Sequence, residues 1–310
     1  MRTVTSHPIS RRRNGWCWRA PSPPTAASCL PRCILEEARL QTDSANYHAD
    51  AGTLPLLVSM PHVGTAIPGD IAAAMTPAAL LKADTDWHLR ELYGFARELG
   101  ASTLAAHWSR YVIDLNRPAD NANLYPGQDT TGLCPLDTFA REPLYQPGRA
   151  PDDAEVRRRL ALYWQPYHEA LQAELDRLLR LHGRVVLWEA HSIASVVPRF
   201  FEGKLPDLNF GSADGASCAP ALMEAVTGAA RADGRYTIAV NGRFKGGHIT
   251  RIHGRPAAGI HALQLEMCQS TYMNETAPFA WRPDLAGQVQ PLLRRMLGAA
   301  AVWAGEGSTA

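Results

Sequence analysis

The stretch Leu54–Pro68, with the sequence LPLLVSMPHVGTAIP, is typical of a buried strand followed by a turn. Its apolar run Leu56–Met60 ends at Pro61, which predicts a short central strand of an α/β sheet. Proteins of this class usually bind their ligands just beyond the carboxyl ends of such strands. His62 stands at that point and is a candidate site residue, although a single histidine there is more often a hydrogen-bonded structural residue.

Two further apolar runs carry side chains that can do chemistry. Val185–Trp188 leads into Glu189 and His191, which share one face of the strand if it continues that far. The run Ile260–Met267 contains Glu266, and a carboxylate is seldom fully buried without a partner or a task. A second strand that ends in a histidine strengthens the functional interpretation of the first.

Helical patterns alternate with these apolar runs, which predicts a mainly parallel sheet covered on both faces. The helices predicted from apolar spacing and end signals are Asp86–Leu99, Asp152–His182, Pro220–Asp233 and Pro283–Ala304, with a shorter helix beginning at Thr76-Pro77. We expect Pro166 to kink or split the longest of them. Further strands are predicted at Tyr111–Leu115 and Tyr236–Val240, and a long loop at Asp120–Ala150.

Composition excludes several classes of protein. The chain has 310 residues, 46% of them hydrophobic, and a net charge of +1, which does not point to nucleic acid. No apolar run approaches the roughly 18–20 residues that a membrane span requires. The six cysteines stand at irregular spacing without a CxxC pair, so they predict neither a disulfide framework nor a cysteine zinc site. We therefore expect a cytoplasmic protein, and the sequence carries no signal of its oligomeric state.

The first fifty residues differ from the rest of the chain. Met1–Asp50 contains an arginine run at Arg11–Arg13, several prolines and half of the cysteines, but no sustained apolar period. It also lacks the apolar segment of about 7–15 residues that a signal peptide requires. We interpret it as a disordered extension, which a wrong start-codon assignment would explain. Residues 51–310 are then expected to form a single α/β domain whose structure begins near Leu54.

Charged side chains gather at other predicted element ends. Asp84 and Asp86 stand at the start of a predicted helix, where carboxylates are favoured by the helix dipole alone. Arg117, at the end of a predicted strand, can hold a carboxylate with two parallel hydrogen bonds, although a surface ion pair is the simpler explanation. Arg251 follows the glycine pair Gly246-Gly247 and can bring a second arginine to the same region.

Two imidazoles and a carboxylate can hold zinc and leave a position for water, which the ion makes a nucleophile at neutral pH. A further carboxylate can then accept the proton of the water and pass it to the departing amine. The residues that could fill these roles are His62, Asp86, His191, Glu266 and Arg117. Spacing alone does not select this set, because the chain has no HExxH helix. Manganese, iron and cobalt suit the same ligands, and Asp84 or Glu189 are alternatives for the third ligand.

Several sequence blocks in order resemble the N-formylglutamate amidohydrolase (N-formylglutamate deformylase) family between Leu54 and Arg295. The blocks are SMPHVGTAIP, TDWHLRELY, VIDLNRP, LWEAHSI, FEGKLPDLNFG, FKGGHITR and LQLEMCQSTYMNE. The resemblance implies a zinc-dependent hydrolase of three-layer α/β/α architecture with a mixed, mainly parallel sheet, similar to zinc carboxypeptidases. It implies conversion of N-formyl-L-glutamate and water to formate and L-glutamate in histidine breakdown.

The resemblance also implies roles for individual residues. His62 and His191 would bind zinc together with Asp86, Glu266 would be the general base, and Arg117 and Arg251 would face the two substrate carboxylates, with Asn116 beside Arg117. Glu189 stands where a shorter acid is expected, and His248 where an aromatic residue such as tyrosine is expected. One alternative is hydrolysis of another N-acyl amino acid or a small peptide. Another is a protein that binds an acidic metabolite without catalysis.

Overall fold

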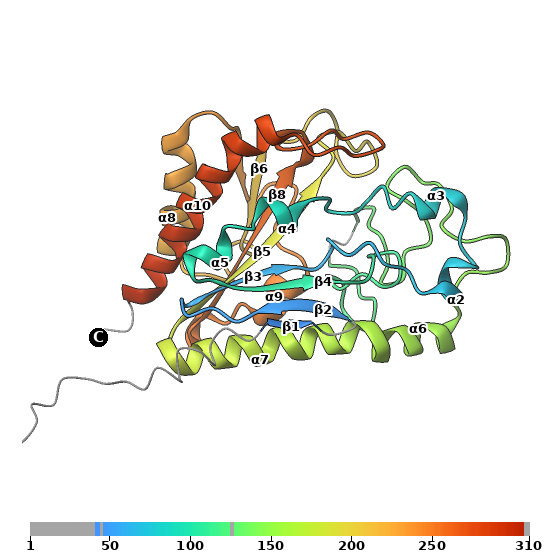
Figure 1. Ribbon diagram of the computed structural model, residues 1–310, viewed down its shortest axis with the longest axis horizontal. Helices are drawn as coiled ribbons and strands as arrows, with labels where there is room; N and C mark the ends of the chain where they lie inside the picture. The colour runs from blue at the N-terminus through green and yellow to red at the C-terminus, as the bar shows by residue number, and fades with distance from the viewer. Residues whose placement is uncertain (1–40, 44–45, 125–126, 307–310) are drawn as a thin grey trace, which may run out of the picture.

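The structure is a computed structural model that describes residues 41–43, 46–124 and 127–306. A central sheet is covered by helices on both faces, which gives three layers (Figure 1). In these residues the sheet has eight strands in the order β1-β2-β4-β3-β5-β8-β6-β7. The strands are β1 Gln41–Asp43, β2 Tyr47–Asp50, β3 Leu56–Met60, β4 Ser102–Ala106, β5 Val185–Ile193, β6 Leu208–Gly211, β7 Ile238–Val240 and β8 Ile260–Cys268.

The centre of the sheet is parallel and its flanks are mixed. β3 pairs in parallel with β4 and β5, and β5 pairs in parallel with β8. β2 and β6 are antiparallel neighbours of β4 and β8, while β1 pairs antiparallel with β2 and β7 pairs parallel with β6. The predicted three-layer α/β/α fold with a mixed, mainly parallel sheet is confirmed.

Two apolar clusters fill the space between the layers. Along β3, Leu56 and Val58 pack with helices on one face of the sheet, whereas Leu57 packs with those on the other face. Because both faces are covered, all five residues of the strand are buried, including the one polar residue, Ser59, whose hydroxyl hydrogen-bonds to that of Tyr167. The first face carries α4 Leu89–Leu92, α5 Ala96–Leu99, α8 Pro220–Asp233 and α10 Pro283–Gly305, and the second α7 Gln165–His182 and α9 His248–His253 (Figure 1).

The longest predicted helix is confirmed, and it is interrupted as expected. Asp152 caps its start by accepting a hydrogen bond from the backbone N–H of Glu155. The helix then runs as α6 Asp153–Arg159, a π-helical turn η1 Leu160–Trp164, and α7. The irregular turn ends two residues before Pro166, whose ring cannot be accommodated by regular helix geometry in the preceding turn.

The predicted helix Asp86–Leu99 is wrong, because the structure forms only the two short helices α4 and α5 in that range. Tertiary contacts replace its first turn. The backbone N–H of Asp86 donates to the carbonyl of His62, and His88 adopts a left-handed conformation with φ of 61°. Gly100, with φ of 95°, does end α5 as predicted.

The predicted strand Tyr111–Leu115 is also wrong, since the structure gives it no strand. These side chains are buried, but the segment turns tightly: the N–H of Val112 donates to the carbonyl of Ser109, and that of Asp114 donates to Leu133 across the fold. The strand in this part of the sheet is β4, just upstream. The following segment, 120–150, contains no named helix or strand in its described residues, as predicted for a long loop.

Residues 1–40 of the predicted N-terminal extension lie outside the described residues. Tyr47–Asp50, which we placed in that extension, form β2 and pair antiparallel with β4, so the sheet begins before Leu54. The strand is half-buried and near the sheet edge, which explains why it lacks an apolar signal.

The remaining predicted elements agree with the structure. Thr76 caps α3 Pro77–Leu80 by accepting a hydrogen bond from the N–H of Ala79, while the predicted strand Tyr236–Val240 is shortened to β7. The short helices not yet named are α2 Gly69–Ala72, η2 Pro256–Ala258 and η3 Gln269–Thr271. None of the helices in the described part of the chain is long and apolar enough to cross a bilayer.

Candidate functional site

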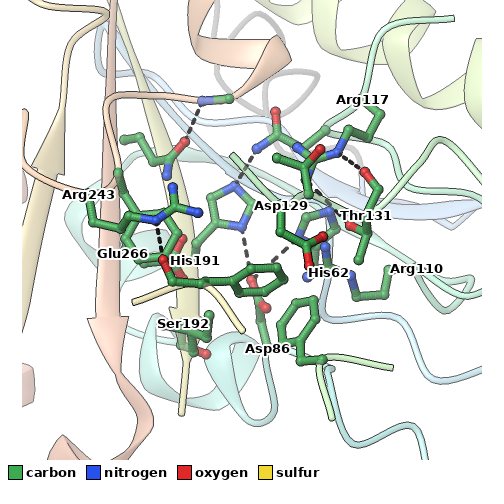
Figure 2. A pocket seen from close by; sticks show the side chains of 18 residues that line it. His62, Asp86, Arg110, Arg117, Asp129, Thr131, His191, Ser192, Arg243 and Glu266 are labelled. Atoms are coloured by element: carbon green, nitrogen blue, oxygen red, sulfur yellow. Dashed lines mark hydrogen bonds and ion pairs between the residues drawn. The ribbon is translucent and has the colours of Figure 1, made fainter. Parts of the chain in front are cut away.

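A cavity lies beyond the carboxyl end of β3 and beside the carboxyl-terminal parts of β5 and β8 (Figure 2). His62, His191 and Glu266 line it, as the strand-end argument predicted. The other lining residues from the predicted set are Asp86, Asn116 and Arg117. The structure thus brings together six of the seven predicted site residues.

His62 is held by an acid that is itself held by an arginine. Its Nε2 lies 2.6 Å from Oδ1 of Asp114, whose other oxygen accepts a hydrogen bond of 2.7 Å from Nη2 of Arg110. Burial and the nearby Arg110 charge lower the pKa of His62 to about 4. Burial alone would raise the pKa of Asp114, but its contacts with His62 and Arg110 hold that pKa well below the usual range. His62 is therefore a neutral imidazole whose Nδ1 is on the side of Asp86, 3.8 Å from Oδ2.

His191 lies between two carboxylates. Its Nδ1 is 3.0 Å from Oδ2 of Asp86, and its Nε2 is 3.0 Å from Oε1 of Glu189. Although burial opposes it, the hydrogen bonds to Asp86 and Glu189 raise the pKa of His191 well above its ordinary value. Asp86 thus faces both imidazoles, and the site favours a positive charge at this position.

The chemistry of this donor set fits a divalent metal ion. One ligand atom from each of His62, Asp86 and His191 lies within 4.8 Å of the others, and all three residues are buried. The second nitrogen of each imidazole already contacts a carboxylate, Asp114 or Glu189, which is the arrangement that orients metal-binding histidines. In the described part of the chain this is the one such group of potential metal ligands.

The two alternatives for the third ligand lie elsewhere. Glu189 contacts the far nitrogen of His191, away from Asp86. Asp84 is buried outside the cavity lining, where its Oδ2 accepts the backbone N–H of Phe139 at 2.9 Å. Geometry therefore favours Asp86 among the three acids.

Glu266 lies on β8 directly opposite His191 on β5. Burial raises the pKa of Glu266 to about 8. The charges of His191 and Arg110 act against burial and lower this pKa. Additional positive charge beside Glu266 would therefore bring its pKa back toward the ordinary value. A carboxyl group tuned toward neutrality in a cavity is typical of general acid–base chemistry.

Three arginines line the cavity, and only one of them was predicted. Arg117 is bound through its Nε to the carbonyl of Thr131 at 2.8 Å. Arg110 and Arg243 were missed, and Arg251 is not among the lining residues, since its Nε donates to the carbonyl of Gly246. The substrate role of Arg251 remains a prediction. Arg243 could have been found from its place beside the glycines, and Arg110 from its spacing of four residues to Asp114.

Asn116 connects the candidate metal centre to α9. Its Oδ1 accepts the backbone N–H of Ile249 at 2.9 Å, which directs Nδ2 toward Nε2 of His191, 2.9 Å away. Gly247 packs against this amide, and a Cβ at residue 247 would clash with it. Gly247 is thus required for close approach, as the occurrence of the glycine pair in the sequence suggested.

The fold and this donor set define an α/β protein with a candidate metal centre at the edge of its sheet. Residues 54–273 match the N-formylglutamate amidohydrolase family, and the chain belongs to that family. It is 51% identical to the N-formylglutamate deformylase of Pseudomonas putida, over 82% of this chain and 95% of that protein. It is also 51% identical to the N-formylglutamate deformylase of Pseudomonas aeruginosa, over 82% of this chain and 96% of that protein.

Solved structures agree with this family. The chain resembles a crystal structure of N-formylglutamate amidohydrolase from Ralstonia eutropha, with a TM-score of 0.73 and 28% identity, over 85% of this chain and all of that one. A gene product from Agrobacterium tumefaciens has a TM-score of 0.63 at 18% identity, over 84% of this chain and 96% of that one. The second similarity concerns the fold alone.

Proposed function

We propose that this protein hydrolyses N-formyl-L-glutamate to formate and L-glutamate, as in the branch of histidine breakdown that the sequence resemblance implies. The observation that carries the proposal is the 51% identity to two N-formylglutamate deformylases over nearly their whole length. The cavity supports it, because it combines a metal-type donor set, a buried acid and arginines that suit a substrate with two carboxylates.

His62, Asp86 and His191 are the proposed ligands, and zinc is the ion that best suits two imidazoles and one carboxylate. When bound, such an ion supplies Lewis acidity, which polarises a carbonyl group and makes water a better nucleophile near neutral pH. Asp114 and Glu189 hold the imidazoles in position through the nitrogen that faces away from Asp86.

Glu266 is the proposed general base. It accepts the proton of the water that attacks the formyl carbon, and it then donates that proton to the nitrogen of glutamate as the C–N bond breaks. Its position opposite His191 keeps it next to the proposed ligands, and its burial excludes bulk water from the proton that it transfers. Formate and L-glutamate leave with the atoms of one water molecule divided between them.

Asn116 and Arg117 are the proposed substrate-binding residues on the wall formed by the segment after β4. Arg117 is fixed by its hydrogen bond to the carbonyl of Thr131, which orients its guanidinium group for a carboxylate. Arg110 differs, because its charge is already balanced by Asp114 in a buried ion pair. A cytoplasmic location remains a prediction from the cysteine pattern.

Formate release by the purified protein tests this function. We expect hydrolysis of N-formyl-L-glutamate, loss of activity on chelation, and restoration by zinc, with manganese, iron and cobalt compared at equal occupancy. Folded, metal-loaded protein that releases no formate from this substrate would contradict the proposal. Comparable turnover of N-formyl-L-methionine would instead favour a broader N-acyl amino acid hydrolase.

A further inference from the structure

The wall of the cavity is chemically divided into two sides. Ile193, Phe200 and Phe244 belong to one apolar cluster, while Asn116, Thr130 and Thr131 form a polar lining. Each side has its own arginine: Arg243 contacts Phe200, and Arg117 contacts Thr131. Figure 2 shows these two arginines on opposite sides of His191.

Arg243 is fixed on the apolar side. Its Nε donates to the carbonyl of Phe200 at 2.7 Å, and its guanidinium carbon lies 5.4 Å from the ring centre of Phe244 and 5.9 Å from that of Phe200. This hydrogen bond and these aromatic contacts restrict the plane of the guanidinium group, so little rotamer freedom is lost when it binds an anion.

The two carboxylates of N-formyl-L-glutamate differ in their surroundings. The α-carboxylate is attached one carbon from the scissile amide, in the polar part of the molecule, whereas the other carboxylate ends a chain of two methylene groups. An apolar wall that ends in a guanidinium group matches the second arrangement, because it covers the methylenes and pairs with the charge. The polar side with Arg117 matches the first.

We propose that Arg243 binds the side-chain carboxylate of the substrate and determines specificity for an acidic side chain, leaving the α-carboxylate to Arg117. The inference rests on the proposed function and assigns to Arg243 the role that the sequence resemblance implied for Arg251. Arg251 is less suited to it, since it does not line the cavity and its Nε is bound to the carbonyl of Gly246.

The test compares N-formyl-L-glutamate with N-formyl-L-glutamine, which has the same shape but a neutral side chain. For the wild-type protein we expect kcat/KM to be about 100-fold higher with the acid. Arg243→Met should lower kcat/KM by about 100-fold for N-formyl-L-glutamate and by less than about 3-fold for N-formyl-L-glutamine. Arg243→Lys, which keeps the charge without the planar fork, should recover about 10-fold of the loss.

Arg251→Met is the matched comparison, and its effect should be the same for both substrates. Equal losses for both substrates in Arg243→Met would show a merely structural role and overturn the inference. A selective loss in Arg251→Met alone would also overturn it. If the wild-type protein hydrolyses both substrates equally well, no side-chain carboxylate is recognised, although the proposed reaction stands. If it hydrolyses neither, the proposed function itself has failed. Metal content and circular dichroism of each variant check that the site and fold are intact.

Discussion

The two halves of the candidate site are built in different ways. His191 and Glu266 stand opposite each other on β5 and β8, where the ladder of backbone hydrogen bonds fixes their register. Arg110, Asp114 and Arg117 stand on a segment without helix or strand, and side-chain hydrogen bonds fix their positions. The strand-borne half, His191 and Glu266, is therefore held in place by the rigid sheet. The loop-borne half, Arg110, Asp114 and Arg117, is held only by individual side-chain contacts.

The pKa values of the two imidazoles are shifted in opposite directions. His62 contacts Asp114, whose charge is balanced by Arg110, and the pKa of His62 is lowered. His191 contacts Asp86 and Glu189, and its pKa is raised. Asp86, on a loop, and Glu189, on β5, thus create the negative potential that attracts a cation, while the ion pair of Asp114 with Arg110 orients an imidazole with little net charge.

The largest effect is expected from the strand-borne half. Glu266→Gln should lower kcat by about 10³-fold, because the carboxamide cannot accept the proton of water. The metal content, measured by atomic absorption after dialysis, should stay equal to that of the wild-type protein. Unchanged turnover would favour a protein that binds an acidic metabolite without catalysis.

Replacing Asp114, which contacts His62, and Glu189, which contacts His191, compares how much each half of the site contributes to metal affinity. We expect Asp114→Asn to weaken metal binding by about 10- to 100-fold, because it removes an orienting acid and leaves the charge of Arg110 unbalanced beside His62. Glu189→Gln should have a smaller effect, since the strand still positions His191. Competition with a chromophoric chelator measures both affinities. A larger loss of metal affinity in Glu189→Gln than in Asp114→Asn would contradict this expectation.

A smaller effect is expected where the two halves meet. Gly247→Ala would push a methyl group into the amide of Asn116 and should destabilise the fold by about 1–3 kcal/mol. Because Asn116 contacts His191, kcat should fall as well. Chemical denaturation measures the first effect and formate release the second. Gly228→Ala, with open space around the added Cβ, is the control and should not destabilise the protein.

The smallest effect concerns the support of the loop-borne half from outside the cavity. Hydrogen bonds from Arg158 and Arg159 lower the pKa of Glu155 to about 2. The acid therefore stabilises the folded state above its ordinary pKa, near 4.5, and this contribution is lost as the pH falls toward 2. Glu155→Gln should cost about 0.5–1 kcal/mol at pH 7, because the pair is partly solvated. The difference between the two unfolding free energies should shrink below pH 4.5, and a difference independent of pH would contradict this account.

The strand-borne half was largely predictable from the sequence, and the loop-borne half was not. Apolar runs ending in His62 and His191 are local signals, so they located the central strands, the site edge and the buried Glu266. The errors at Asp86–Leu99 and Tyr111–Leu115 share a cause in long-range contacts. Asp86 donates its N–H to His62 and Asp114 donates to Leu133, and neither bond has a signature in the neighbouring sequence.

The arginines illustrate the same limit. Sequence position placed Arg117 and Arg251 near the site, but only the folded chain distinguishes a guanidinium group that lines the cavity from one bound to Gly246. Similarly, β2 was missed because a half-buried strand near the sheet edge needs no apolar pattern.

The π-helical turn Leu160–Trp164 limits which changes of length this chain can tolerate. Arg159, just before the turn, donates to the carbonyl of Val112, and Trp164, its last residue, donates to the carbonyl of Arg117. Removing one residue would rewind the turn as α-helix and rotate α6 by about 100° relative to α7. Arg159 and Trp164 could then no longer both donate hydrogen bonds to the segment that contains Val112 and Arg117. A single-residue deletion in this turn should therefore be harmful although the turn lies outside the cavity, whereas substitutions on the outer face of either helix should be tolerated.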